Sequence, residues 1–330
     1  MTTTINTVTG TITSEELGRV LAHEHLLVGW AGWEADTIRP GPSRSEALAL
    51  CSDRVAAIRD HGVTTMIDPC PNDLGRDVEL MAEVAVRTGL QIICATGLYK
   101  EDQGGAPYWK FRASFGAGAE SIAELYVGEL TEGIGRTGVK AGIIKVATGE
   151  GRVSDYERTL LEAAAMASNE TGAPITTHTD AGTCGDEQQR ILTEHGVPPH
   201  RIIVGHSCGS SDFDYHMRIL RGGSYLGFDR FGLEMLQPDE VRIASMLRLL
   251  EAGAASQLVV SHDSVWCWRG EPIPEPEAFG ALLEIWTPTH FFERILPRLK
   301  DGGATDEQIT TMLEENPKRF FEGVAPQVPA

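Results

Sequence analysis

The chain has little positive charge for its length. Its 330 residues include 28 Lys and Arg against 47 Asp and Glu, which gives a formal net charge of -19 at pH 7. Nucleic acids and anionic membrane surfaces attract positively charged proteins, so this balance argues against either of them as a partner. It leaves a small-molecule substrate open, because the local potential inside a cleft can differ from the net charge.

Long hydrophobic runs and paired cysteines are also missing. No stretch of about 18 apolar residues occurs, so no membrane-spanning helix is expected. The start of the chain has neither the basic flank nor the apolar core of a signal peptide. The six cysteines are scattered without a C-x-x-C pair, which is typical of free thiols in a reducing compartment. We therefore expect a cytoplasmic protein without structural disulfides.

What the sequence does contain is a regular alternation of two patterns. Eight short apolar runs rich in β-branched residues occur at 21–28, 64–69, 91–99, 141–148, 174–179, 201–207, 224–230 and 257–263. Helical patterns separate most of them, for example 43–62, 77–89 and 155–172, and the last two end at a glycine. Strands that alternate with helices predict a parallel sheet, and eight such units predict a closed (β/α)8 barrel of the TIM type.

An open doubly wound sheet is the alternative fold. It is expected to carry a glycine-rich phosphate loop after a strand, and no strand here is followed by G-x-G-x-x-G or G-x-x-x-x-G-K-[ST]. No change in composition marks a second domain. We therefore predict one α/β barrel domain over 1–330. The segment 264–285, which includes the Pro- and Glu-rich stretch RGEPIPEPEAFG, is expected to form a loop over the active site.

Polar side chains recur at the ends of the predicted strands, where barrel enzymes place their catalytic residues. They are His23 and His25 in the first strand, Lys145 in the fourth, His178 in the fifth, His206 in the sixth and Asp263 in the eighth. One H-x-H pair alone is weak evidence. Four imidazoles and a carboxylate on several strands, however, favour a site for Zn, Fe, Co or Mn on the C-terminal face of the barrel.

Lys145 allows two interpretations. If its side chain points into the barrel, burial beside cations disfavours the ammonium form, and the neutral amine can ligate a metal or react with carbon dioxide. The resulting carbamate has two oxygens and can bridge two cations. If the side chain points toward the helices instead, Lys145 is an ordinary lysine that reaches outward to solvent.

The segments HEH, IIKVATGEG, ITTHT, VGHS and VSHD together resemble the phosphotriesterase family of the amidohydrolase superfamily. The similarity runs from about residue 17 to residue 321 and includes DLGRD, EQQRIL and ENPKRFF. It implies that His23, His25 and Asp263 hold the more buried of two divalent metal ions, with zinc expected first. It also implies that His178 and His206 hold the other ion, and that N6-carboxylated Lys145 bridges both together with a hydroxide.

The same resemblance implies roles at the substrate side. The hydroxide is expected to attack a carbonyl carbon or a phosphorus, and Asp263 to receive its proton. Tyr99 matches the tyrosine of lactonase members, where aryl-phosphotriester specialists carry tryptophan. Asp229 and Arg230 match the family's "DR" pair; one of them is expected to hydrogen-bond a ligand histidine, and the alternative is a structural salt bridge.

The loop after the eighth strand is expected to shape the substrate pocket. Trp266 and Trp268 would be its apolar walls, and Arg269 or Lys100 would meet an anionic substrate unless they are simply solvated. We therefore predict a metal-dependent hydrolase of lactones or carboxylic esters, acting as a homodimer on a small molecule. A phosphotriesterase is the alternative, and a binding barrel that has lost its chemistry is disfavoured because all six ligands are present.

Overall fold

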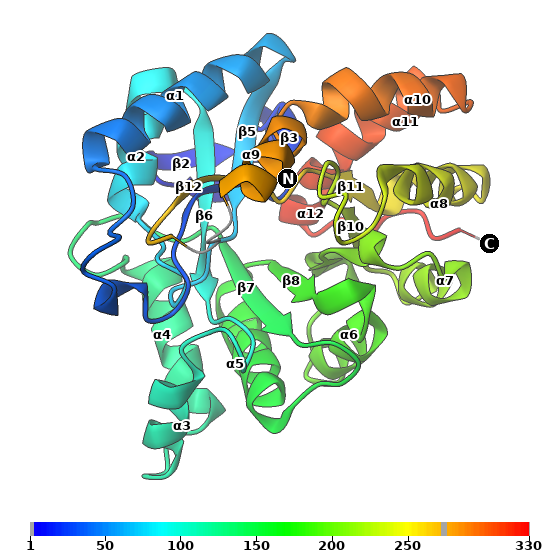
Figure 1. The fold of residues 1–330 in the computed structure, drawn as a ribbon. Coiled ribbons are helices and arrows are strands. Elements are labelled where there is room, and N and C mark those ends of the chain that lie inside the picture. Colours follow the sequence, from blue (N-terminus) through cyan, green and yellow to red (C-terminus); the bar gives the residue numbers. More distant parts are fainter. Residues whose placement is uncertain (1–2, 272–275, 330) are drawn as a thin grey trace.

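The chain folds into a (β/α)8 barrel. The structure is a computed structural model that describes residues 3–271 and 276–329, with the backbone only for 276–279. Eight parallel strands follow one another around the barrel in the order β3-β5-β6-β7-β8-β9-β10-β11 (Figure 1). They are β3 (Arg19–Leu21), β5 (Val63–Asp68), β6 (Gln91–Gly97), β7 (Ile143–Thr148), β8 (Ile175–Thr179), β9 (Ile202–Val204), β10 (Tyr225–Phe228) and β11 (Leu258–Val260). Seven of them coincide with a predicted run, the first overlaps its run only at Leu21, and the predicted fold class is confirmed.

The first strand differs from the prediction of one continuous strand over 21–28. β3 ends at Leu21, and β4 (His25–Val28) leaves the barrel and pairs in parallel with β12 (Val265–Trp268). Between them, the Ala22 N–H donates to the Val260 carbonyl at 3.3 Å and the Glu24 N–H donates to the Ile67 carbonyl at 3.0 Å. The break therefore has a physical reason, because the backbone of 22–24 links the first strand to both of its neighbours and closes the barrel.

Helices surround the barrel on the outside. They are α1 (Arg44–Asp60), α2 (Val78–Thr88), α3 (Ala106–Ala113), α4 (Ala119–Thr131), α5 (Asp155–Thr171), α6 (Gly185–Glu194), α7 (Phe213–Arg221), α8 (Asp239–Glu251), α9 (Pro276–Ile285), α10 (Leu296–Asp301), α11 (Asp306–Thr310) and α12 (Asn316–Glu322). The predicted glycine ends of α2 and α5 are confirmed, since Gly89 and Gly172 cap them with φ of 73° and 75°. No helix in the described ranges has the length and apolarity needed to cross a membrane.

Two sets of buried apolar side chains hold these layers together. One fills the interior of the barrel and includes Val20, Ile67, Ile143 and Val259. The other lies between the strands and the helices and is larger. Alternate residues of each strand supply the two sets, because successive side chains of a strand point to opposite faces.

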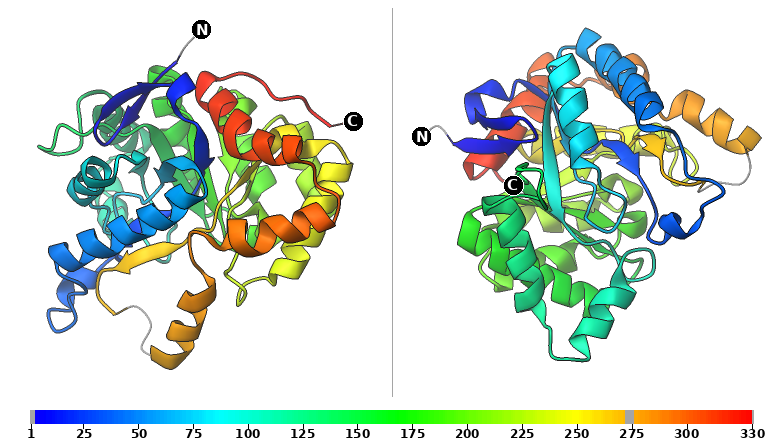
Figure 2. Two further views of the ribbon diagram at one scale, coloured as in Figure 1. Left: turned by 90° about the horizontal axis from the view of Figure 1, so that it is seen from above. Right: turned by 90° about the vertical axis from the view of Figure 1, so that its left-hand side faces the viewer.

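The two ends of the barrel are covered differently. The hairpin of β1 (Thr4–Thr7) and β2 (Gly10–Thr13) lies with α12 at one end, and α9 lies at the opposite end (Figure 2). The first of these ends is filled, since Ile5 packs with Phe320 in the interior core. The predicted loop over 264–285 belongs to the other end and contains β12 and α9; its residues 272–275 lie outside the described residues.

Candidate metal centre and active site

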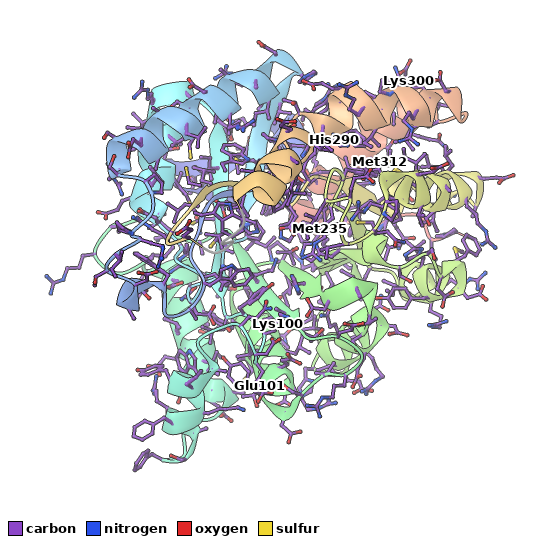
Figure 3. The ribbon with its side chains drawn as sticks, viewed as in Figure 1. Lys100, Glu101, Met235, His290, Lys300 and Met312 are labelled. Atoms are coloured by element: carbon purple, nitrogen blue, oxygen red, sulfur yellow. The ribbon has the colours of Figure 1, made fainter. Side chains whose placement is uncertain are left out.

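The six predicted metal ligands converge at the C-terminal end of the barrel. His23 follows β3, His25 begins β4, Lys145 lies in β7, His178 lies in β8, His206 follows β9, and Asp263 follows β11. All six are at most 9% exposed. They line one cavity of about 490 Å³. Figure 3, viewed onto this end, labels Lys100, which lines the cavity, near the middle of the molecule.

The backbone at the ligands is arranged for this convergence. His206 and Asp263 have φ of 58° and 53°, in the left-handed region that residues other than glycine rarely adopt. Strained residues of this kind persist where the surroundings hold them, often at functional sites. Gly97 has a related role, since a Cβ there would lie 1.8 Å from the Lys145 carbonyl oxygen and would push β6 away from β7. The close approach of these strands sets the depth of Lys145.

Three of the ligands form a compact group. The carboxylate oxygen Oδ1 of Asp263 lies 3.1 Å from Nε2 of His25 and 3.4 Å from Nε2 of His23. One donor atom from each of these residues lies within 4.8 Å of the other two. Two imidazoles and one carboxylate at such distances fit a single divalent cation.

The other two histidines stand beside this group. The ring centroid of His206 lies 4.6 Å from that of His23 and 4.6 Å from that of His178. Nε2 of His206 is buried and has no hydrogen-bond partner among the described residues. A buried ring nitrogen without a partner is costly, and a metal ion would satisfy it. The donor set therefore fits a second cation next to the first.

Carboxylates contact one nitrogen of each of these rings and so determine which nitrogen is left for a metal ion. Nδ1 of His206 lies 2.9 Å from Oδ1 of Asp229, and Nε2 of His178 lies 2.6 Å from Oδ1 of Asp180. Oδ2 of Asp229 also lies 3.3 Å from Nδ1 of His23, so this aspartate contacts one histidine of each group. Such partners fix the orientation of a ligand ring and raise its basicity.

The protonation of His178 and His206 suits metal binding, whereas His25 differs. Burial alone would lower the pKa of His25, but hydrogen bonds with Asp263 and Asp68 hold it well above its usual value. Burial lowers the pKa of His178 to about 3, and burial together with the Arg230 guanidinium holds the pKa of His206 well below its usual value. Both rings are therefore neutral near pH 7, which is the form that ligates metals. Burial alone would raise the pKa of Asp263, but the charge of the Arg230 guanidinium and the hydrogen bond with His25 hold it well below its usual range, and the side chain is a carboxylate.

Lys145 points into the barrel. Its side chain is 2% exposed, and Nζ lies 2.9 Å from Nε2 of His23. Burial lowers the pKa of this lysine to about 8. Its ammonium group forms no ion pair within 4.0 Å in the part of the chain that the structure describes. Of the two interpretations of Lys145, the helix-facing one does not match these contacts.

Tyr99 and Arg230 complete the polar side of the cavity. The Tyr99 hydroxyl lies 3.3 Å from both ring nitrogens of His178, and Nε of Arg230 donates to Oδ2 of Asp263 at 2.8 Å. Burial raises the pKa of Tyr99 well above its usual value, so the hydroxyl keeps its proton and can donate it in a hydrogen bond.

The three residues expected to shape the substrate pocket lie in different places. Trp268 lines the cavity. Trp266 is buried in the core, where its indole N–H donates to Ser264, and Arg269 pairs with Asp77 at 2.9 Å; neither lines the cavity among the described residues.

Several lining residues were not identified from the sequence. The apolar part of the lining includes Trp30, Leu233, Leu236 and Trp286. Trp286 comes from beyond α9, and its indole N–H donates to the His262 carbonyl at 2.7 Å. Trp30 could have been noticed, because it follows the HEH segment by five residues, but no sequence pattern marks Trp286.

Comparison with known proteins places this site in a family. The phosphotriesterase family matches residues 3–321. The structure of an organophosphorus hydrolase from Deinococcus radiodurans is 42% identical, with a TM-score of 0.93 over 96% of this chain and 96% of that chain. An aryldialkylphosphatase from Saccharolobus solfataricus is 35% identical over 94% of this chain and 96% of its own length. A phospho-furanose lactonase from Mycoplasmopsis synoviae is 29% identical over 96% of this chain and 90% of its own. The chain therefore belongs to the phosphotriesterase family of hydrolases.

Proposed function

We propose that the protein is a binuclear metal-dependent hydrolase of lactones or carboxylic esters. The observation that carries this proposal is the position of the Tyr99 hydroxyl, 3.3 Å from the ring of His178 inside the cavity that the six ligands line. A phenol at this position can donate a hydrogen bond to the oxygen of a substrate carbonyl that approaches the metal centre.

Two divalent cations, with zinc the first choice, would be held in this way: one by His23, His25 and Asp263, whose donor atoms lie within 4.8 Å of one another, and one by His178 and His206, whose ring centroids are 4.6 Å apart. When bound, such a pair lowers the pKa of a shared water and polarises the substrate oxygen. Lys145 is proposed to be carboxylated, its amine forming a bond to the carbon of carbon dioxide with loss of one proton. Two observations support this: Nζ of Lys145 lies 2.9 Å from Nε2 of the proposed ligand His23, and the amine has no ion-pair partner among the described residues, so a carbamate there would be available to the cations.

Four side chains of the protein would transfer the proton, position the substrate and orient the ligands. Asp263 would receive the proton of the attacking water, and Arg230 would hold that carboxylate in place through its 2.8 Å contact with Oδ2. Tyr99 would orient the carbonyl group. Asp229 would keep His23 and His206 in fixed orientations.

The cavity favours an uncharged substrate with an apolar group. Apart from Lys145, its lysine and arginine side chains are already paired within the protein: Lys100 with Asp180, Arg230 with Asp263, and Arg242 with Asp239. Aromatic and aliphatic side chains form the rest of the wall, including Trp30, Trp268 and Trp286. This lining suits an alkyl or aryl substituent better than a phosphorylated one.

A substrate panel tests the proposal. Aliphatic lactones of several ring sizes and simple aryl esters are assayed beside paraoxon, with metal content measured on the same sample. The proposal predicts that kcat/KM for at least one lactone or ester exceeds that for paraoxon. The opposite ranking across the whole panel would instead make the protein a phosphotriesterase.

We also propose that the protein is a cytoplasmic homodimer. Its six cysteines carry free thiols, which suit a reducing compartment. Phe111 and Phe115 are 66% and 78% exposed next to each other, which suits an interface. Light scattering on the purified protein would measure the mass, and the mass of one chain would contradict the dimer.

A further inference from the structure

Glu24 lies between the two metal-ligating histidines of the first strand and is itself fully buried. Its side chain reaches across to the residues around Asp263 at the end of the last strand. Oε1 accepts hydrogen bonds from the Ser261 hydroxyl at 2.7 Å, the His262 backbone N–H at 2.8 Å and Nδ1 of His262 at 2.6 Å. Oε2 accepts from the Ser264 N–H at 3.2 Å and also from the Ser264 hydroxyl. Both neighbours of Asp263 are therefore held by one carboxylate.

The side chains of His262 and Ser264 also bond to other groups, and these bonds fix which of their atoms donate to Glu24. Nε2 of His262 accepts the Phe291 backbone N–H at 2.9 Å, so the ring proton must lie on Nδ1 and point to Glu24. The Ser264 hydroxyl donates to Glu24 while it accepts the indole N–H of Trp266 at 3.0 Å. The Nδ1 proton of His262 and the hydroxyl proton of Ser264 therefore both point to the Glu24 carboxylate.

This contact has a direct consequence for Asp263. Asp263 has φ of 53°, a left-handed conformation that is unfavourable for a residue other than glycine. The His23 carbonyl accepts the Asp263 N–H at 2.9 Å, so the same two strands are joined on both sides of the ligand. The hold on 262 and 264 therefore restrains the backbone on both sides of Asp263 and limits how far it can relax toward a right-handed conformation.

We propose that Glu24 is a positioning residue for the metal centre, which maintains the left-handed conformation of Asp263 and so fixes the geometry of the His23, His25 and Asp263 site. The proposal rests on the metal centre of the proposed function. It assigns to the middle residue of the HEH segment a role distinct from that of a ligand or a catalytic residue.

The carboxylate form is essential to this role. In a Glu24→Gln variant the amide has one acceptor oxygen and one NH2 group. Whichever way the amide is turned, its NH2 group faces a backbone N–H, either that of His262 or that of Ser264. Two hydrogen-bond donors then face each other in a buried position, and the one left unsatisfied destabilises this arrangement.

Glu157 offers a matched control. It is 3% exposed and also accepts backbone N–H groups on both oxygens, from Gly149 at 3.0 Å and from Ser154 at 2.9 Å. Glu157→Gln should therefore suffer the same conflict between donors. However, Glu157 contacts none of the six ligands and does not line the cavity.

The experiment compares E24Q, E157Q and the unchanged protein in two measurements. The first is the affinity for zinc and the rate of zinc release to a coloured chelator. The second is the rise in melting temperature when zinc is added to the metal-free protein. E24Q should bind at least one of the two zinc ions about 10- to 100-fold more weakly and show a smaller rise, as expected for loss of a partner that orients a ligand. E157Q should melt lower without metal but keep the affinity and the rise.

The outcomes separate this inference from the proposed function. Equal zinc affinity in E24Q and the unchanged protein would overturn the role of Glu24 and leave the metal centre standing, as would an equal loss in E157Q. If the unchanged protein binds no zinc or other divalent cation, the proposed metal centre itself is wrong. If E24Q does not fold, Ser264→Ala removes only one hydroxyl contact, and it should weaken zinc binding several-fold; unchanged binding there would contradict the proposal.

Discussion

The two sides of the cavity are built in different ways. On the metal side, His23, Lys145 and His178 come from strand ends in the barrel and are at most 3% exposed. Each hydrogen-bonds or ion-pairs with a polar neighbour. On the apolar side, Leu236 and Trp286 come from loops and from the segment after α9, and Leu236 is 59% exposed.

This difference assigns the chemical reaction to the metal side and the choice of substrate to the apolar side. The rigid side holds the groups that activate water, and a shift of one ångström there would disturb the reaction. The loop-borne side mainly contributes apolar surface, and loops vary more than the strands that they connect. Relatives named for lactones and for organophosphates are therefore compatible with one shared metal side.

The largest effect is expected from breaking the metal side. His206→Ala removes a ligand whose cavity-facing nitrogen has no hydrogen bond within the described structure. Activity should fall on the order of 1,000-fold, because Lewis-acid stabilisation is worth several kcal/mol. Elemental analysis should find close to two metal ions per chain before the change and fewer after it. Full activity after chelation would contradict a metal-dependent mechanism.

Lys145→Ala should have the next largest effect, with loss of at least about 100-fold in rate, since under the proposed mechanism it removes the group that would contact both cations. Short carboxylic acids added to the assay should restore part of the activity by supplying the missing carboxylate. Normal turnover and metal content in this variant would show that Lys145 is not a ligand.

Tyr99→Phe tests the proposed contact between the Tyr99 hydroxyl, beside the metal ligands, and the substrate carbonyl. It removes one hydroxyl at His178 and should lower lactone hydrolysis about 10- to 150-fold, the worth of a hydrogen bond to a charged partner. Paraoxon hydrolysis should change much less, because it depends on the leaving group and the pocket shape. Equal losses on both substrates would point to general damage of the metal centre.

Trp268→Ala acts on the apolar side. It should raise KM for a long-chain lactone about 10-fold and leave kcat nearly unchanged, since the indole contributes apolar contact surface of roughly 1.5 kcal/mol or more. The lactone without a side chain serves as the control substrate. A fall in kcat for both substrates would show that Trp268 supports the metal side instead.

Arg269→Ala should have the smallest effect. This residue neighbours Trp268 but points to Asp77 and stacks over Trp33 outside the cavity. Because the ion pair is partly exposed, its loss should change the free energy of unfolding by less than about 1 kcal/mol and kcat/KM by less than about 2-fold. A strong and selective loss on anionic lactones would restore Arg269 as a substrate contact.

Much of the fold could be predicted because its signals are local. Each barrel strand is a short β-branched run, and α2 and α5 end at Gly89 and Gly172, where only a left-handed turn can follow. The ligand residues could be named for the same reason, since they stand at the ends of these runs. Their arrangement into two groups rested on family resemblance, and the distances within the first group agree with it.

The sequence by itself determined the alternation of strands and helices and the chemical identity of the metal side, because periodicity and residue type are properties of short segments. Only the tertiary structure decided that Glu24 holds the residues around Asp263, almost 240 positions away, that Trp286 lines the cavity, and that Trp266 and Arg269 do not. It also decided that the first strand divides after Leu21. These outcomes depend on contacts between segments that are far apart in the sequence and come together only when the barrel closes. A local pattern of side chains does not specify such contacts.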